Sequence, residues 1–487
     1  MYDTCMSASS FFGRQQQLGE LRGHLELATS TGAGRLVAVR GRRQVGKSRL
    51  IEEFTSTSGV PYGAVSGLKG SPVAVQMRRA VETLRSSAVP LRDLDAVLSV
   101  PPSNWYDLLS RLPLALRDGP AVLVIDEFPW AEETNPGLSG LIQSLWDQEL
   151  SREPILVILI GSDEAMMDRL FEHDRPLFGR LDAQLVVDPF NPFETSLALG
   201  GSRSAVEVFD THLVTGGFPE LVAHARQFET TRSLLEDGLS RPHTLLADVA
   251  QITLAGELAD GLNARLVLNA LGADEIGVMN FSRIVSNLGG DKNAETAVVR
   301  AVAVLVESKR LVAIDLPAGN RNARLRHYRI TDPYLRCWYR FIEPHLHNVE
   351  VGRPDLAISD LHRSWSSWRG RAIEPIVRQA VLRLAPRLDA PFKSITSIGG
   401  WWDRKGDHEY DLVGTDRSNE PVALGSVKWR EGAAFDASDL ADLATGRSVI
   451  PRAGAARLVA VAPRGVAPGV GVDLVLDASA LLSAWRP

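Results

Sequence analysis

The 487-residue chain has few cysteines, no long apolar run and no overall excess of basic charge. Its two cysteines, Cys5 and Cys337, are far apart, which excludes a disulfide framework or a cysteine metal motif and is typical of a reducing compartment. The longest apolar stretch, residues 155–160, is about a third as long as a membrane span. The N-terminal sequence MYDTCMSASSFFGR lacks a basic segment followed by an apolar run, so we expect no signal peptide and a cytoplasmic protein. A net charge of −6 excludes a uniformly basic nucleic-acid coat.

The residues that are present are typical of a globular protein, because 45% are hydrophobic and 23% are charged. The length predicts roughly three domains. From about residue 35 to 190, short apolar runs alternate with segments of helical length, which predicts a parallel sheet between helices. These runs are RLVAVR, AVLVIDEF, PILVILIGS and AQLVVDPF, beginning at residues 35, 121, 154 and 183.

A phosphate-binding loop is predicted directly after the first of these runs. The sequence GRRQVGKS at residues 41–48 matches G-x4-G-K-[ST] and precedes a helix-like segment. Such a loop points backbone N–H groups and a helix N-terminus at phosphate oxygens, while the lysine reaches the β- and γ-phosphates and the serine binds Mg²⁺. We therefore expect ATP and Mg²⁺ as ligands, held by Gly41, Arg42, Arg43, Gln44, Val45, Gly46, Lys47 and Ser48.

Two acidic residues and a serine complete the predicted nucleotide site. Asp126 ends a buried apolar strand, where a carboxylate is costly unless it holds a cation, so we expect it to share Mg²⁺ with Ser48. Glu127 is the candidate base that orients or activates the attacking water. Ser162 ends another buried strand and is a candidate sensor of the γ-phosphate or the water.

Seven motifs occur in an order that resembles a known family. They are FFGRQQQLGEL, GRRQVGKS, VLVIDEF, LIGSDEAMM, PLFGR, GGFPE and YRITDPYLRCWYRF. The chain resembles archaeal-type P-loop ATPases of the STAND branch of AAA+ proteins, in the subgroup with a C-terminal domain of unknown function. The resemblance covers nearly the whole chain, and its nucleotide-binding motifs are more specific than its C-terminal ones.

The resemblance implies roles for further residues. Phe12, Gly13 and Arg14 look like the segment that lies near the adenine base. Pro219 is similar to a family proline whose backbone meets the nucleotide from the helical side. Arg180 occupies the position of an arginine that reads the γ-phosphate in cis or from a neighbouring subunit, although a structural salt bridge also explains it.

The segment from residue 261 to 340 is basic and has the element order of a winged helix, three helices followed by a hairpin. It holds twelve Lys and Arg against seven Asp and Glu, and four arginines, Arg321, Arg324, Arg326 and Arg329, crowd the predicted wing. Two interpretations stay open: the wing contacts DNA phosphates, or the domain packs against the ATPase and transmits its state. The recognition-helix candidate, rich in valine and alanine, offers few side chains for reading bases.

The C-terminal segment has the outline of a restriction-endonuclease-like fold. Glu374 lies near the start of an amphipathic helix, Asp411 lies on a strand, and Lys428 lies on the next strand. Strand alternation places Glu409, Asp411 and Val413 on one face. Ser426 stands where this fold has a second carboxylate, so the metal site is one ligand short and vestigial nuclease, active nuclease and unrelated module remain alternatives.

We therefore expect an α/β chain of the P-loop NTPase (AAA+/STAND-like) class. The favoured function is a slow Mg-dependent ATPase that acts as a nucleotide-controlled switch. The alternatives are an ATP-regulated metal-dependent nuclease and a winged-helix DNA-binding regulator. The expected partners are ATP, DNA, an unidentified protein and other copies of the chain, with no membrane. The expected domains are an ATPase core (1–195), a helical lid (196–260), a winged helix (261–347), a linker (348–368) and a restriction-endonuclease-like domain (369–487).

Overall fold

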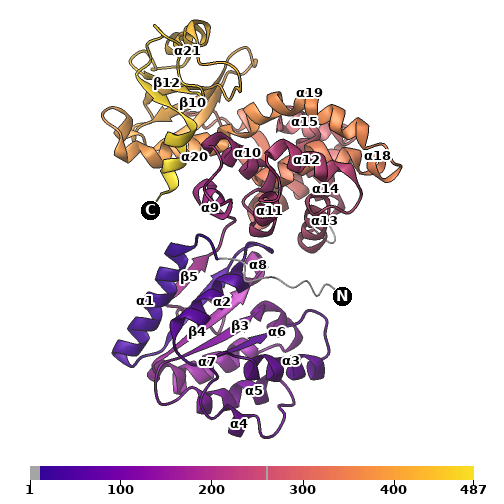
Figure 1. The fold of residues 1–487 in the computed structure, drawn as a ribbon, viewed down its shortest axis with the longest axis vertical. Helices are drawn as coiled ribbons and strands as arrows, with labels where there is room; N and C mark the ends of the chain where they lie inside the picture. The colour runs from indigo at the N-terminus through magenta and orange to yellow at the C-terminus, as the bar shows by residue number, and fades with distance from the viewer. Residues whose placement is uncertain (1–10, 259–260, 487) are drawn as a thin grey trace. The chain divides into compact units, whose positions relative to one another are not determined.

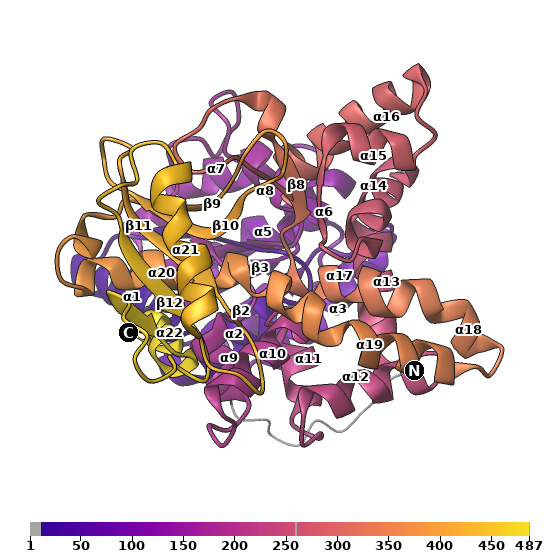
Figure 2. The same cartoon turned by 90° about the horizontal axis from the view of Figure 1, so that it is seen from above.

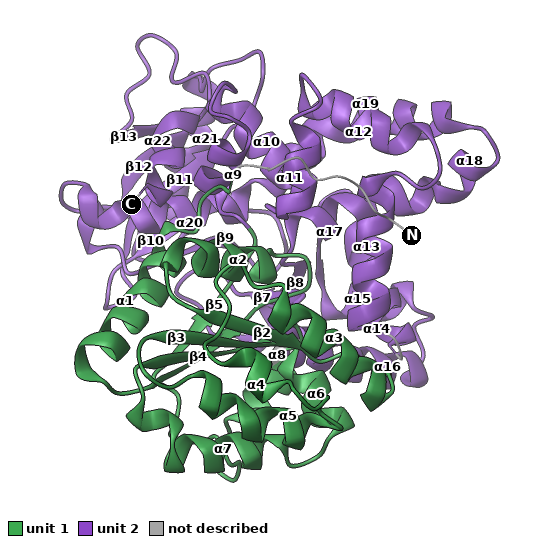
Figure 3. Cartoon of the chain, turned by 60° about the horizontal axis from the view of Figure 1, so that its bottom comes forward, with its two compact units in different colours: residues 1–189 green, residues 190–487 purple. Residues whose placement is uncertain are grey.

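The computed structural model describes residues 11–258 and 261–486, which form two compact units divided between residues 189 and 190 (Figure 3). Residues 1–10, which include Cys5 and most of the segment expected to lack a signal peptide, lie outside the described residues. The same holds for residue 260, the expected end of the lid. No helix within the described ranges is long and apolar enough to cross a membrane.

The first unit contains the predicted parallel sheet, with strand order β2-β3-β4-β1-β5 (Figure 1). The four predicted apolar runs form strands, and the sequence interpretation missed only the short strand YGAVS. Every residue of the central strand β4 is buried, as expected for a strand covered on both faces. The bounds are β1 (Arg35–Arg40), β2 (Tyr62–Ser66), β3 (Ala121–Asp126), β4 (Ile155–Gly161) and β5 (Ala183–Val186).

Helices cover this sheet on both faces. On one face α3, α5 and α7 pack over strand residues such as Val65, Ile125 and Val157, around the fully buried Trp105. On the other side α1 contacts β1, β4 and α2. The helices of this unit are α1 (Gln15–Thr31), α2 (Lys47–Ser58), α3 (Val73–Arg85), α4 (Leu94–Val97), α5 (Trp105–Arg111), α6 (Phe128–Thr134), α7 (Leu138–Gln148) and α8 (Glu164–Leu170).

The second unit begins with helices, as predicted for residues 196–260. They are α9 (Pro192–Ala198), α10 (Ala205–Thr215), α11 (Pro219–Ala225), α12 (Thr231–Ser240) and α13 (Leu245–Glu257). Side-chain caps start several of them, for example Asn191 and Glu194, which form a reciprocal capping box at α9.

The basic segment after residue 260 contains three helices, a small antiparallel sheet with strand order β6-β8-β7 and a fourth helix after the last strand. Its elements are α14 (Leu262–Ala273), β6 (Val278–Asn280), α15 (Phe281–Asn287), α16 (Lys292–Ala303), β7 (Val312–Asp315), β8 (His327–Ile330) and α17 (Pro333–Cys337). The sequence predicted the first three helices and the β7–β8 hairpin but missed β6.

A helix occupies the segment for which we expected a linker. Residues 348–368 include most of α19 (Pro354–Ala372), which follows the short α18 (Leu346–Glu350). Leu361, Trp365 and Trp368 of α19 are buried, and Phe341 packs edge to face on Trp368 at 5.3 Å between ring centroids. The polar residues between these apolar positions suggested a linker, but the helical spacing of Leu361, Trp365 and Trp368 gives α19 a buried face.

The C-terminal part forms a mixed sheet with strand order β13-β12-β11-β10-β9 (Figure 2). Its first three strands are antiparallel and β11, β12 and β13 are parallel. Its elements are α20 (Glu374–Leu384), β9 (Ser397–Trp402), β10 (Glu409–Thr415), β11 (Pro421–Val427), α21 (Ala437–Val449), β12 (Arg457–Val461), β13 (Leu474–Leu476) and α22 (Ala478–Leu482).

One expected side-chain direction in this sheet is wrong. The pairing of β10 with β9 shifts register between Tyr410 and Val413, and both residues join the same hydrophobic cluster under α21. An irregularity of this kind re-aims the side chains that follow it, so Val413 does not share a face with Asp411.

Candidate functional site

The phosphate-binding loop connects β1 to α2, and its backbone requires glycine. Gly41 has φ 156° and Gly46 has φ 89°. A Cβ on Gly41 would lie 2.2 Å from the Val187 carbonyl oxygen, so no larger residue fits there. Because α2 begins at Lys47, its free N–H groups face the loop, which is the arrangement that binds phosphate.

Lys47 and Arg14 hold this loop from within. The Lys47 side chain is buried, and its Nζ donates to the carbonyl oxygens of Gly41 and Arg42 at 2.8 Å each. Arg14 Nη2 donates to the Val45 carbonyl oxygen at 3.0 Å. Arg14 and the adjacent Gly13 have φ 60° and 68°, and α1 starts directly after them. Arg14 therefore braces the loop, whereas the adenine role of Phe12, Gly13 and Arg14 stays a prediction.

Ser48 and Asp126 bring a hydroxyl and a carboxylate together beside the carboxyl ends of β1 and β3. The Ser48 hydroxyl donates to Asp126 Oδ2 at 3.1 Å. Burial, and then the neighbouring charge of Glu127, raise the pKa of Asp126, so a cation here would relieve the cost of its charge. A hydroxyl and a carboxylate suit Mg²⁺, which takes one or two protein ligands and completes its shell with phosphate and water oxygens.

Glu127 has a strained backbone and one free carboxylate oxygen. Its φ is 47°, a left-handed conformation that costs a non-glycine residue on the order of 1 kcal/mol. Oε1 accepts the Ser162 hydroxyl, while Oε2 is buried and has no hydrogen-bond partner among the described residues. The structure thus brings Glu127 and Ser162 together. Sequence reasoning missed Gly67, where a Cβ would lie 2.5 Å from the Glu127 carbonyl oxygen.

The C-terminal carboxylates lie in a cluster with arginines. Burial and the charge of Asp411 raise the pKa of Glu374 to about 7. Arg378 donates to Glu374 at 2.9 Å and to the Asp411 carbonyl at 2.6 Å, and Arg371 pairs with Glu374 at 3.4 Å. The Asp411 carboxylate accepts the Val427 N–H at 2.7 Å and the Ser426 hydroxyl at 3.2 Å.

Lys428 does not share in this cluster's hydrogen bonds. Its Nζ lies 3.5 Å from Asp439 of α21. Across the described ranges, no group of three or more His, Cys, Asp or Glu side chains is placed to hold a metal ion. Glu374 and Asp411 therefore lie in one cluster, while the ion pair with Asp439 turns Lys428 toward α21, which the sequence spacing could not reveal.

Comparisons with known proteins agree with this geometry. Residues 10–158 match the AAA ATPase domain family. The chain contains an AAA ATPase domain. Residues 338–440 match a second family, described as archaeal and bacterial proteins of unknown function.

Similar whole proteins were also found. An uncharacterized protein of Methanocaldococcus jannaschii is 21% identical over 423 residues, which cover 86% of this chain and 88% of that protein. The Walker-type ATPase of Pyrococcus abyssi is 16% identical, over 68% of this chain and 96% of that one, with a TM-score of 0.46. The ORC2 protein of Aeropyrum pernix, solved in ADPNP-ADP complexes, is 14% identical over 74% and 98%, with a TM-score of 0.45.

Arg180 follows the matched residues 10–158 in the chain and lies at the edge of the sheet opposite the phosphate loop. It forms a two-pronged ion pair with Asp147 at 2.8 and 3.0 Å, near the end of α7. Two residues on, Asp182 accepts the N–H of Leu36 at 2.8 Å, at the start of β1. Leu36 and Gly41 are separated by about 17 Å of extended strand. The γ-phosphate role in cis is therefore wrong, and the role toward a neighbouring subunit stays a prediction.

Pro219 belongs to the second unit, where it starts α11. Gly216 and Gly217 before it have positive φ, and a Cβ on Gly217 would lie 2.0 Å from the Phe190 carbonyl oxygen. The positive φ angles and the close approach of Phe190 explain why GGFP has glycine at these two positions. The nucleotide contact of Pro219 stays a prediction.

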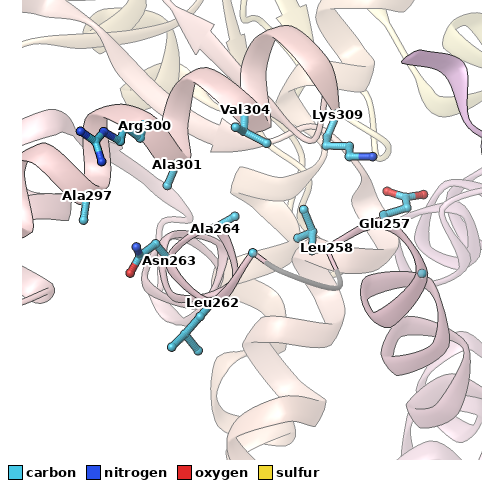
Figure 4. A pocket seen from close by; sticks show the side chains of 12 residues that line it. Glu257, Leu258, Leu262, Asn263, Ala264, Ala297, Arg300, Ala301, Val304 and Lys309 are labelled. Carbon is cyan, nitrogen blue, oxygen red and sulfur yellow. The ribbon is translucent and has the colours of Figure 1, made fainter. Parts of the chain in front are cut away.

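Three sets of basic residues after position 260 differ in their surroundings. Arg283, Arg329 and Arg340 form ion pairs with Asp274, Asp315 and Asp360. Arg300 and Lys309 border an open pocket between α14 and α16, which is also lined by Leu262 and Val304 (Figure 4). The third set is exposed and lies between β7 and β8: Arg321, Arg324 and Arg326.

Proposed function

We propose that this protein binds Mg-ATP, hydrolyses it slowly and uses the nucleotide state as a switch. The proposal rests chiefly on one observation: Lys47, Ser48, Asp126 and Glu127 gather at the carboxyl ends of β1 and β3, beside a glycine-dependent loop. In open α/β sheets, ligands bind outside the carboxyl ends of the strands. The match of residues 10–158 to the AAA ATPase domain supports the same function.

The residues have distinct roles in this proposal. Lys47 exchanges the carbonyl oxygens of Gly41 and Arg42 for phosphate oxygens, so its charge stabilises the transferring group. Ser48 and Asp126 would hold Mg²⁺, which supplies positive charge to the β- and γ-phosphates. Residues 41–48, which the sequence assigned to the nucleotide, wrap the phosphates with backbone N–H groups.

Glu127 and Ser162 control the water that attacks the γ-phosphate. The free Oε2 of Glu127 accepts a proton of this water and orients it. Ser162 occupies Oε1 and thereby restrains the carboxylate. A base that is held by a second side chain fits a slow ATPase, in which hydrolysis limits the lifetime of the ATP-bound state.

We further propose the finer fold assignments. The order α14-β6-α15-α16-β7-β8 supports a winged helix within residues 261–347, and α20 followed by the mixed sheet supports a restriction-endonuclease-like fold for 369–487. We propose in addition the STAND assignment and a cytoplasmic location, with the ATPase core at residues 1–195 and the helical lid at 196–260. In this proposal the nucleotide state controls binding to a protein partner or to other copies of the chain.

Two alternatives differ in their support. An ATP-regulated nuclease is disfavoured, because Arg371 and Arg378 already pair with Glu374 and because Ser426 supplies a hydroxyl where this fold has a second strand carboxylate. DNA association is favoured by the exposed arginines between β7 and β8.

The test is the Glu127→Gln variant. We expect its ATP turnover to fall by about 100-fold or more while ATP binding is retained, because general base catalysis contributes that much. The control is Glu133→Gln on α6, the helix that starts directly after Glu127, where the side chain is exposed. Steady-state phosphate release and equilibrium ATP binding are measured together. Unchanged turnover in Glu127→Gln would remove this residue from the base role.

A further inference from the structure

The loop between β7 and β8, residues 316–326, lies against the edge strand β9 of the C-terminal sheet. The Ala318 N–H donates to the Gly400 carbonyl at 2.8 Å, and Trp402 Nε1 donates to the Leu325 carbonyl at 3.1 Å. The His327 and Trp402 rings stack in parallel, with centroids 4.3 Å apart. These contacts place the 316–326 loop beside the turn that follows β9, residues 403–408.

Five cations of these two loops form what we call the composite surface: Arg321, Arg324, Arg326, Arg404 and Lys405. Arg324 and Arg326 flank Leu325, and Arg404 and Lys405 follow its hydrogen-bond partner Trp402 by two and three positions. All five are exposed, and none has an ion-pair partner among the described residues.

The nearby acids do not neutralise this surface. Residues 316–326 contain no acid, and residues 403–408 contain two, which leaves a net charge of +3 over the two loops. Asp403 is turned to its own loop, where it accepts the N–H groups of Gly406 and Asp407 at 2.6 and 2.9 Å. Asp315 and Glu409 pair with Arg329 and Arg371. The chain as a whole has a charge of −6, so the cations are concentrated here against the overall charge.

We propose that the composite surface binds the phosphate backbone of a nucleic-acid duplex. Guanidinium and ammonium groups on two adjoining loops suit rows of phosphates, which give affinity without sequence readout. A single strand is disfavoured, because it is bound by stacking its bases on exposed aromatic rings. Trp402 is buried and its face is covered by His327, so no such platform is offered.

The inference extends the DNA association proposed above and does not rest on ATP hydrolysis. It assigns two of the five cations to the turn that follows β9 of the C-terminal sheet, outside both the β7–β8 loop and the P-loop domain. Loss of ATP binding in a Lys47 variant and loss of duplex binding in the variants below are therefore separate outcomes.

The salt dependence of binding gives the size of the expected effect. Each phosphate contact with duplex DNA contributes about 0.9 to the slope of log affinity against log salt concentration, so five contacts predict a slope of about −4.5. Raising the salt from about 50 to about 200 mM then weakens binding about 500-fold. Removing three contacts predicts a slope of about −2, and removing two predicts about −3.

The experiment uses the full chain and a fluorescein-labelled 30-base-pair duplex of arbitrary sequence, followed by fluorescence anisotropy over that salt range. The variants are R321A/R324A/R326A for the first loop and R404A/K405A for the second. The matched control is R78A/R79A/R85A, which removes three exposed charges from α3 of the other unit. Urea unfolding confirms that each variant is folded.

We expect both loop variants to flatten the slope and the α3 control to leave it unchanged. A slope that stays at the wild-type value in R404A/K405A overturns the composite surface, as does an equal loss in the α3 control or no wild-type binding at about 50 mM salt. A DNA duplex and an RNA duplex are compared to determine which kind of nucleic acid the surface binds more tightly. Tighter binding of a single strand, or of vesicles containing phosphatidylserine, contradicts the duplex assignment.

Discussion

Replacement of Arg369 by methionine is expected to loosen the second unit at its most buried ion pair. Arg369 of α19 and Asp210 of α10 are both almost fully buried, and Arg369 Nη1 donates to Asp210 Oδ2 at 2.8 Å. Its Nη2 donates to the Trp429 carbonyl at 3.1 Å, and Trp429 Nε1 donates to Asp210 Oδ1 at 3.2 Å. The cluster thus joins α10, α19 and the segment that follows β11.

The variant leaves the Asp210 carboxylate buried with one hydrogen bond and no cation. Breaking a buried pair on one side costs about 3–5 kcal/mol. Burial already raises the pKa of Asp210 to about 6, against the opposing effect of Arg369, so the variant raises it further. A carboxyl group whose folded-state pKa is raised contributes stability at low pH that is lost as pH rises through that pKa. The deficit of Arg369→Met is therefore smaller at pH 5 than at pH 8.

Urea unfolding followed by tryptophan fluorescence measures this at both pH values. The control is Arg363→Met on the same helix, because Arg363 is exposed and its pair with Asp360 should contribute less than about 1 kcal/mol. Adding Asp210→Asn to Arg369→Met should recover stability at pH 8. Equal midpoints for Arg363→Met and Arg369→Met, or a deficit that is larger at pH 5, would refute the reasoning.

Two further predictions concern Arg180 and the buried His212. Arg180→Ala should leave ATP turnover within about twofold, because a reader of the γ-phosphate would be worth about 1,000-fold or more; a loss of that size in phosphate release would restore the role between subunits. Burial lowers the pKa of His212 to about 4, and its Nδ1 meets the Thr195 hydroxyl at 3.0 Å. A histidine with a depressed folded-state pKa contributes stability above its unfolded pKa that is lost as pH falls, here about 2 kcal/mol between about pH 7.5 and 5. His212→Asn should remove this part of the acid sensitivity in urea unfolding, and an identical pH profile would contradict it.

Local patterns in the sequence predicted which residues lie together at the candidate nucleotide site. The loop at residues 41–48 has its chemistry in consecutive residues, and the apolar runs that end at Asp126 and Ser162 form adjacent parallel strands. Strand ends of a parallel sheet meet at one edge, so Ser48, Asp126 and Glu127 could be grouped without coordinates. The sequence interpretation missed the strand Tyr62–Ser66 because an alternating pattern of only five residues is a weak indication of a strand.

Contacts between distant residues could not be predicted. Arg180 is part of a motif that suggested a nucleotide role. Its partner Asp147, however, is 33 positions earlier in the chain, at the edge of the sheet opposite the phosphate loop. The spacing of Arg371, Glu374 and Arg378 along the sequence is compatible with ion pairs on neighbouring helical turns. Nothing in the sequence showed that Lys428 pairs with Asp439. The register shift after Tyr410 is likewise set by pairing with β9 and not by local composition.

The central claim, that the loop at residues 41–48 binds ATP, is tested most directly by the dissociation constant of Mg-ATP for Lys47→Ala. Losing the hydrogen bonds of a buried ammonium to phosphate costs about 1.5–3 kcal/mol, which is about 10- to 100-fold in affinity. Lys393→Ala, an exposed lysine in the other unit, is the control and should bind as the wild type does. We expect Lys47→Ala to weaken binding by that factor, and an unchanged dissociation constant would contradict the account.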